Sequence, residues 1–133
     1  MASSLSPDAL ERFYRRYNQA CNDHRFSDLT EFVAEQVLVD GEPRSRLDYM
    51  RALEAVVAAF PDSRWDLRHL MTDGDWIAAR FIDTGTHGGT FLGVPATGRA
   101  VTAQEFAFYR VEAGRIAEVW GTADDLHLLE QLR

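Results

Sequence analysis

The chain has 133 residues, a formal net charge of −7 and 46% hydrophobic residues. This length favours a single domain, residues 1–133, with its own core. The acidic balance argues against nucleic-acid binding, because the 14 basic residues, all arginines, are scattered among acids. No apolar run approaches the roughly 20 residues that a membrane span needs, and the N-terminus lacks a signal pattern. We therefore expect a cytoplasmic protein.

The first 60 residues predict three helices and one short strand. Ser6 and Pro7 are typical of a helix start, and a helix of about five turns follows. A second short helix is expected over residues 26–33, capped by Ser27, then a strand over residues 37–39. A third helix is expected over residues 45–60 and ends before a proline. The first helix carries one apolar stripe at three- and four-residue spacing: Leu10, Phe13, Tyr14, Tyr17, Ala20 and Cys21.

The second half predicts a sheet and a terminal helix. Strands are expected over residues 63–72, 76–87, 101–111 and 116–120, and a helix over residues 123–132. Glycines between residues 84 and 99 predict a shaped loop in place of regular structure. Strict alternation in the first of these strands would place Trp65, Leu67, His69 and Met71 on one face. Helices first, then strands, then a helix indicate the α+β class.

Several short motifs, in one order and spacing, resemble the SnoaL-like polyketide cyclase family. The resemblance covers most of the chain. The motifs that carry it are Phe60-Pro61-Asp62, Asp73-Gly74-Asp75, Thr84-Gly85-Thr86-His87, Gly89, Phe91 and Gly93, Pro95 to Arg99, Gly114-Arg115-Ile116, Trp120 with Asp124, and Leu128-Leu129 before Gln131-Leu132.

The resemblance implies a cone-shaped α+β fold. A curved antiparallel sheet would wrap over the N-terminal helices, with a short C-terminal helix, and enclose a pocket. It also implies a cofactor-independent intramolecular aldol ring closure on an aromatic polyketide or another apolar carbonyl compound. Members of such folds commonly dimerise, and the open sheet face around Phe106 and Phe108, or Val101 and Tyr109, is the expected homodimer surface.

Two residues are candidates for the chemistry. The family implies that Asp124, four residues after the tryptophan, is the general acid/base, which requires a partly apolar pocket that raises its pKa. Its other reading is a helix N-cap, the commonest use of Asp at such a place. His87 would assist by hydrogen bonding or proton transfer. Its other reading is a histidine held by backbone groups of the glycine-rich loop.

Five aromatic or histidine side chains are candidate pocket walls, although each residue type is more often core than ligand contact. They are Trp120, His69, Trp65, Tyr14 and Phe108.

Two alternatives to the cyclase reading remain open. Asp40 lies near the place where ketosteroid-isomerase-like members of the superfamily carry their base, so a double-bond isomerisation would depend on it. Many cyclase-type members have a histidine immediately before the tryptophan, where this chain has Val119. That difference favours a third reading, a ligand-binding or interaction module without catalysis. We expect no metal and no cofactor, because the four histidines are far apart and no dinucleotide or phosphate-loop fingerprint is present.

Overall fold

The computed structural model describes residues 5–133, which form three helices, one 3₁₀ helix and six strands. This is an α+β arrangement with the helices at the N-terminal side and a short helix at the end, as the sequence predicted. In chain order the elements are α1 (Pro7–Asn22), η1 (Phe26–Glu31), β1 (Val33–Val39), β2 (Glu42–Ser45), α2 (Arg46–Ala59), β3 (Arg64–Asp73), β4 (Trp76–Thr86), β5 (Ala100–Glu112), β6 (Arg115–Ala123) and α3 (Asp125–Gln131).

The strands form one curved, open sheet in the order β2-β1-β6-β5-β4-β3. Every neighbouring pair is antiparallel except β1 and β6, which run parallel. The sheet is therefore mixed, not purely antiparallel as expected. The reason is topological: β1 and β6 are joined by no hairpin, so no tight turn imposes an antiparallel direction on them.

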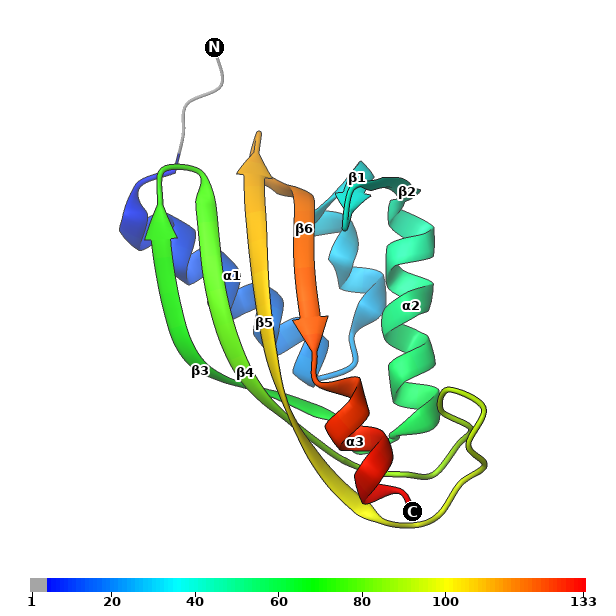
Figure 1. Cartoon of the computed structure of the whole chain (residues 1–133). Coiled ribbons are helices and arrows are strands. Elements are labelled where there is room, and N and C mark those ends of the chain that lie inside the picture. Colours follow the sequence, from blue (N-terminus) through cyan, green and yellow to red (C-terminus); the bar gives the residue numbers. More distant parts are fainter. Residues whose placement is uncertain (1–4) are drawn as a thin grey trace.

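Helices α1 and α2, with η1, cover one face of the sheet (Figure 1). The two helices begin as their sequences indicate, because the hydroxyls of Ser6 and Ser45 accept hydrogen bonds from the amides of Ala9 and Asp48, both at 3.1 Å. The apolar stripe of α1 is buried against the sheet and forms most of the main core with β4 and β5. We call the sheet face under these helices the inner face.

A second, smaller core lies where α3 packs beside β5 and the end of α2. It contains Phe60, Val101, Ala103, Leu128 and Leu132. In Figure 1 the loop over residues 87–99 runs beside the C-terminal end of α2, at the same end of the molecule as α3. The C-terminal end of α2, the loop over residues 87–99 and α3 therefore lie at one end of the molecule.

Three local predictions need correction. Residues 26–31 form a 3₁₀ helix that begins after Arg25 without a side-chain cap, so Ser27 is not the cap. Strand β1 begins at Val33, four residues earlier than expected. In β3 the pairing register shifts between Leu67 and His69, and such a bulge turns the following side chains to the other face.

The outer face of the sheet is rich in exposed apolar side chains: Met71, Trp76, Phe106, Phe108 and Trp120. Among residues 5–133 no helix combines the length and apolarity needed to cross a bilayer. The prediction that the N-terminus lacks a signal pattern rests partly on residues 1–4, which lie outside the described residues.

Candidate functional site

The main inner cavity has a volume of about 220 Å³ and lies between α2, the inner face of the sheet and α3. Its wall is mostly apolar, and three carboxyl groups interrupt it: Asp83 from β4, Glu105 from β5 and Asp125 from the first turn of α3. Asp125 and Arg64 line the cavity and are also exposed, so the cavity opens to solvent beside them. A mainly apolar cavity with few polar groups is the usual form of a small-molecule site.

A second chamber of about 100 Å³ lies deeper under α1, and Leu53, Trp65 and Glu105 line both chambers. Four tyrosines, Tyr14, Tyr17, Tyr49 and Tyr109, line the second chamber. Burial raises the pKa of all four phenols, so their hydroxyls stay protonated and available as donors. The Tyr17 and Tyr49 hydroxyls are hydrogen-bonded to each other. Glu105 thus stands between an apolar chamber and a chamber lined with hydroxyls.

Asp83 and Glu105 form a carboxyl pair on the inner face. In the register of β4 and β5, Asp83 pairs with Ala103 and Phe81 pairs with Glu105, so the two acids are diagonal neighbours on one face. The buried Oδ1 of Asp83 receives no hydrogen bond from any N–H or O–H group of residues 5–133. The neighbouring carboxyl that acts on Asp83 is that of Glu105, which raises its pKa, and two carboxyls can form a hydrogen bond only when one of them carries the proton.

Burial, and next the neighbouring Glu105 carboxyl, raise the pKa of Asp83 to about 10. The direction follows from elementary electrostatics, since a charged carboxylate is disfavoured both by an apolar wall and by a second negative charge. The raised pKa therefore favours the neutral form of the Asp83 carboxyl at neutral pH. A carboxylic acid kept neutral in this way can donate a hydrogen bond or a proton at physiological pH.

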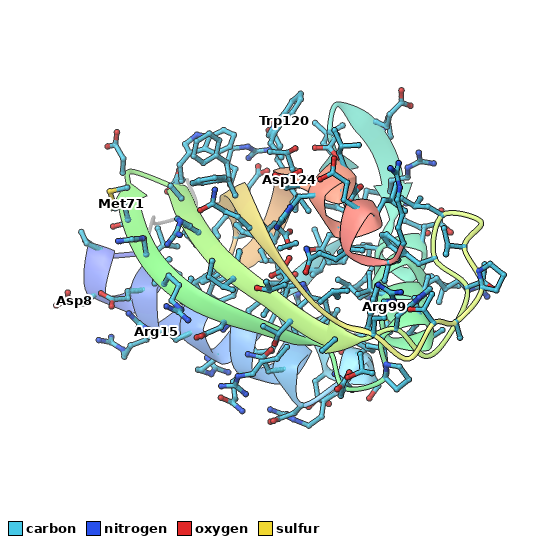
Figure 2. All side chains as sticks on the ribbon, turned by 60° about the horizontal axis from the view of Figure 1, so that its bottom comes forward. Asp8, Arg15, Met71, Arg99, Trp120 and Asp124 are labelled. Atoms are coloured by element: carbon cyan, nitrogen blue, oxygen red, sulfur yellow. The ribbon has the colours of Figure 1, made fainter. Side chains whose placement is uncertain are left out.

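Asp124 lies immediately before α3, where its Oδ1 accepts a hydrogen bond from the His127 amide at 3.1 Å. Its side chain is exposed and does not line either inner chamber. Figure 2 shows it at the start of α3, on the side of the molecule away from α1. This is the N-cap geometry that the sequence left open as the alternative. The catalytic role that the family resemblance implies for Asp124 stays a prediction.

The cap predicts the effect of two substitutions at Asp124. Asp124→Ala removes the acceptor for the His127 amide and should destabilise the fold by about 1 kcal/mol, whereas Asp124→Asn keeps an equally good cap and should change stability little. Urea denaturation of both variants measures the difference. Equal stability of the two variants would show that the cap contributes nothing.

His87 is fully buried at the start of the loop over residues 87–99. Its Nδ1 accepts from the Thr97 amide at 3.2 Å, so its proton is on Nε2 in the neutral form, and Nε2 has no partner among residues 5–133. The ring lies 5.5 Å from that of Phe60, centroid to centroid, and does not line the cavity. This matches the reading in which backbone groups of the loop hold the histidine. Its catalytic role also stays a prediction.

The five candidate wall residues divide between the two faces of the sheet. Trp65 lines both chambers and Tyr14 lines the second. Phe108 and Trp120 are cross-strand partners on the outer face, 56% and 43% exposed, and His69 is turned outward by the β3 bulge and contacts Arg80. The expectation that His69, Phe108 and Trp120 line the inner pocket is therefore corrected: strand alternation and the bulge direct them away from it.

Asp40 lies in the turn between β1 and β2, with a positive φ of 51°. Its Oδ1 accepts a hydrogen bond from the Gly121 amide at 3.0 Å, and the side chain is exposed. It lines neither inner chamber. The contact ties the hairpin to β6, which is a structural use for this residue.

Sequence reasoning did not single out Asp83 and Glu105. The available signal was an acid in step with apolar residues on a strand face. Asp83 shares a strand face with Ile77, Ala79 and Phe81, and Glu105 shares one with Ala103 and Ala107, because these residues are spaced by two. An acid on such a face is buried, and a buried acid must be paired, hydrogen-bonded or protonated. Within residues 5–133 no group of three or more His, Cys, Asp or Glu side chains is arranged to hold a metal ion.

Comparison with known proteins finds one family along nearly the whole chain. Residues 11–132 match the model described as SnoaL-like polyketide cyclase. The aklanonic acid methyl ester cyclase DauD of Streptomyces sp. strain C5 is 28% identical over 125 residues, which cover 89% of this chain and 78% of the relative. The cyclase DnrD of Streptomyces peucetius, of the same description, is also 28% identical, over 89% of this chain and 86% of its own.

The fold agrees with this match. A crystal structure of a SnoaL-like polyketide cyclase from Agrobacterium tumefaciens superposes with a TM-score of 0.84 and 31% identity, and the match covers 93% of this chain and 98% of that one.

Proposed function

Because the chain belongs to the SnoaL-like polyketide cyclase family, we propose that it is an acid/base enzyme acting on an apolar carbonyl compound. The proposed reaction is an intramolecular aldol ring closure or a related proton transfer, without a cofactor. One observation carries the proposal: carboxyl groups interrupt the wall of a mostly apolar cavity under the helices. A carbonyl compound in that cavity would place its acidic C–H bonds beside oxygen bases and away from bulk water.

The cavity wall and the relatives both support one class of substrate. The aromatic and aliphatic lining, which includes Phe60, Trp65 and Phe91, suits a flat apolar ring system. Two relatives are described as cyclases of aklanonic acid methyl ester, so an aromatic polyketide ester is the first substrate to test. Three carboxyl groups and one arginine, Arg64, line the cavity, and this acidic balance favours an uncharged ester over a free carboxylate.

The test is turnover of aklanonic acid methyl ester. Incubation with the purified protein should convert the open ester to the ring-closed product, followed by liquid chromatography with mass detection, faster than buffer alone. A thermal shift measured in parallel reports binding separately, because a ligand at about 100 times its Kd stabilises the fold by roughly 2.7 kcal/mol. Binding without turnover would favour the ligand-binding module. The proposal would be contradicted if the protein neither bound nor converted any aromatic ester or ketone.

Asp124 and Asp40 remain to be tested as bases in the same assay. The family resemblance predicts that Asp124→Asn abolishes turnover without loss of stability, since asparagine preserves the cap. A steroid-type isomerisation would instead depend on Asp40, and its hydrogen bond to Gly121 gives that role no support. The two single substitutions, compared at equal stability, separate these roles.

For assembly we propose a homodimer through the outer face. Its support is the group of exposed apolar side chains on β3 to β6, among them Phe106, Phe108 and Trp120. Light scattering of the wild type and of Phe108→Arg tests it. A wild type that is monomeric at micromolar concentration would contradict it.

A further inference from the structure

We propose that the Asp83–Glu105 carboxyl pair is the proton-transfer centre of the inner cavity, with one carboxylate as base and one carboxylic acid as proton donor. The inference rests on the proposed function, because it names the groups that would perform that chemistry. It replaces the single exposed Asp124 by two side chains that line the cavity.

The position of the pair is the first support. Asp83 and Glu105 come from the two central strands β4 and β5, whose register holds them on the inner face as diagonal neighbours. Both line the apolar chamber, and Glu105 also lines the chamber with the tyrosine hydroxyls. A substrate in the main chamber would therefore contact both carboxyls at once. Groups on paired strands are also held more precisely than groups on a loop.

The hydrogen bonding of the pair is the second support. Oδ1 of Asp83 is buried and has no donor among the described residues, and none of the salt bridges found in residues 5–133 includes Asp83 or Glu105. A buried carboxyl without a donor or cation destabilises a fold. The pair has no visible structural use, unlike Asp62, whose two oxygens accept from the amide and hydroxyl of Thr86 at 2.6 and 2.8 Å.

The charged and titratable groups around the pair are few. Strand β3 contributes Arg64 and helix α3 contributes Asp125, both exposed at the cavity mouth. On the other side, α1, α2 and β5 contribute the hydroxyls of Tyr14, Tyr17, Tyr49 and Tyr109 and the thiol of Cys21. Burial raises the pKa of each of these groups, so they are neutral at pH 7. A proton on the Asp83 carboxyl is therefore the one available for transfer in this cavity.

The proposed steps balance without an additional reactant. The carboxylate of the pair takes a proton from the carbon next to the substrate carbonyl, the C–H bond breaks, and the carboxylic acid gives its proton to the carbonyl oxygen to form an enol. The enol carbon then attacks the second carbonyl and a C–C bond forms. The carboxyl that took the carbon-bound proton gives it to the new alkoxide, while the enol O–H returns its proton to the other carboxylate. The pair ends with one proton, as it began.

The test is exchange of hydrogen for deuterium next to the carbonyl of α-tetralone, an uncharged bicyclic aryl ketone, followed by NMR in D₂O. The wild type should accelerate exchange with a bell-shaped pH–rate profile, since one carboxyl must be ionised and the other protonated. Asp83→Asn and Glu105→Gln should each lower the rate roughly 100-fold, within the range for general acid/base groups. In Asp83→Asn the high-pH limb of the profile should disappear, which a purely structural role would not cause.

Asp8→Asn is the matched control, a change of the same kind at an exposed residue of α1 that lines neither inner chamber. It should exchange within about threefold of the wild type, and circular dichroism with urea denaturation shows that each variant is folded. Exchange retained in both pair variants and lost in Asp124→Asn would overturn the inference while leaving the proposed function standing. A wild type that neither exchanges α-tetralone nor closes an aromatic ester would overturn both.

Discussion

Asp83→Asn should make the protein more stable at neutral pH, by about 2 to 4 kcal/mol, although it removes a group proposed to be essential for turnover. Each unit of pKa displacement corresponds to about 1.4 kcal/mol, and folding at pH 7 must supply a proton to a carboxyl whose pKa in the unfolded chain is about 3.9. Asparagine has the same shape, needs no proton and can donate its amide to Glu105. It therefore avoids this cost.

The sign of the pH dependence follows from the raised pKa of Asp83 in the folded state. Between about pH 4 and pH 10 the folded chain binds a proton that the unfolded chain has lost, so stability falls as pH rises through this window. The Asp83 carboxyl makes its full contribution to stability only below the pKa that it has in the unfolded chain. The advantage of Asp83→Asn over the wild type should accordingly be absent near pH 4 and grow toward pH 8.

Asp62→Asn provides a control of opposite sign. The amide and then the hydroxyl of Thr86 lower the pKa of Asp62, so its contribution is present above the unfolded pKa and is lost as pH falls through the lower folded value. Asp62→Asn should therefore reduce stability at pH 7 and leave it unchanged at low pH. Urea denaturation at pH 4, 6 and 8 measures both variants. An Asp83→Asn variant less stable than the wild type at every pH would show that Asp83 is ionised and well solvated.

Gly89→Ala should destabilise the fold by about 2 to 4 kcal/mol. A Cβ at residue 89 would lie 2.2 Å from the carbonyl oxygen of Ala58, a backbone atom that cannot move aside. The amides of Gly88 and Gly89 donate to the Ala59 carbonyl at 2.9 and 3.1 Å, and so satisfy an end of α2. Displacing the loop combines an overpacking cost of about 1 to 3 kcal/mol with the loss of such bonds at about 1 kcal/mol each.

Comparing Gly93→Ala with Gly89→Ala separates the cost of a steric clash from the cost of an unfavourable backbone conformation. Gly93 has a φ of +81° and no atom within 4 Å of its would-be Cβ, so this change should cost only about 1 kcal/mol. Since Phe91 of the same loop lines the main cavity, Gly89→Ala should also weaken α-tetralone binding, measured by thermal shift. If the two glycine variants lost equal stability, the close contact with α2 would not determine the position of the loop.

Helix starts and strand faces were predictable where one local pattern determines them. Ser6 and Ser45 cap α1 and α2, and alternation placed Ile77 and Phe81 on the buried face of β4. The bulge in β3 was not predictable, because alternation continues through His69 in the sequence while the pairing register shifts. The prediction that His69 lines the pocket, which rested on strict alternation, was therefore wrong.

The carboxyl pair required information that the sequence pattern does not contain. Alternation placed Asp83 on an apolar face, which already indicates a buried acid. Its approach to Glu105 depends on the register of β4 with β5, and the long loop over residues 87–99 between them, unlike a two-residue turn, does not fix that register. The roles of Asp124 and Asp125 also depend on the angle at which α3 begins, since adjacent helical residues differ by about 100° in direction.

The most direct test of the proton-sharing pair is a ¹³C NMR titration of the side-chain carboxyls in the wild type, with Asp83→Asn and Glu105→Gln to assign the signals. We predict that one carboxyl signal keeps the chemical shift of the protonated acid at pH 7, titrates well above the ordinary range for Asp, and is absent from Asp83→Asn. If instead every side-chain carboxyl titrates below about pH 6, near ordinary values, no proton is shared in the cavity, and the account of its chemistry is wrong.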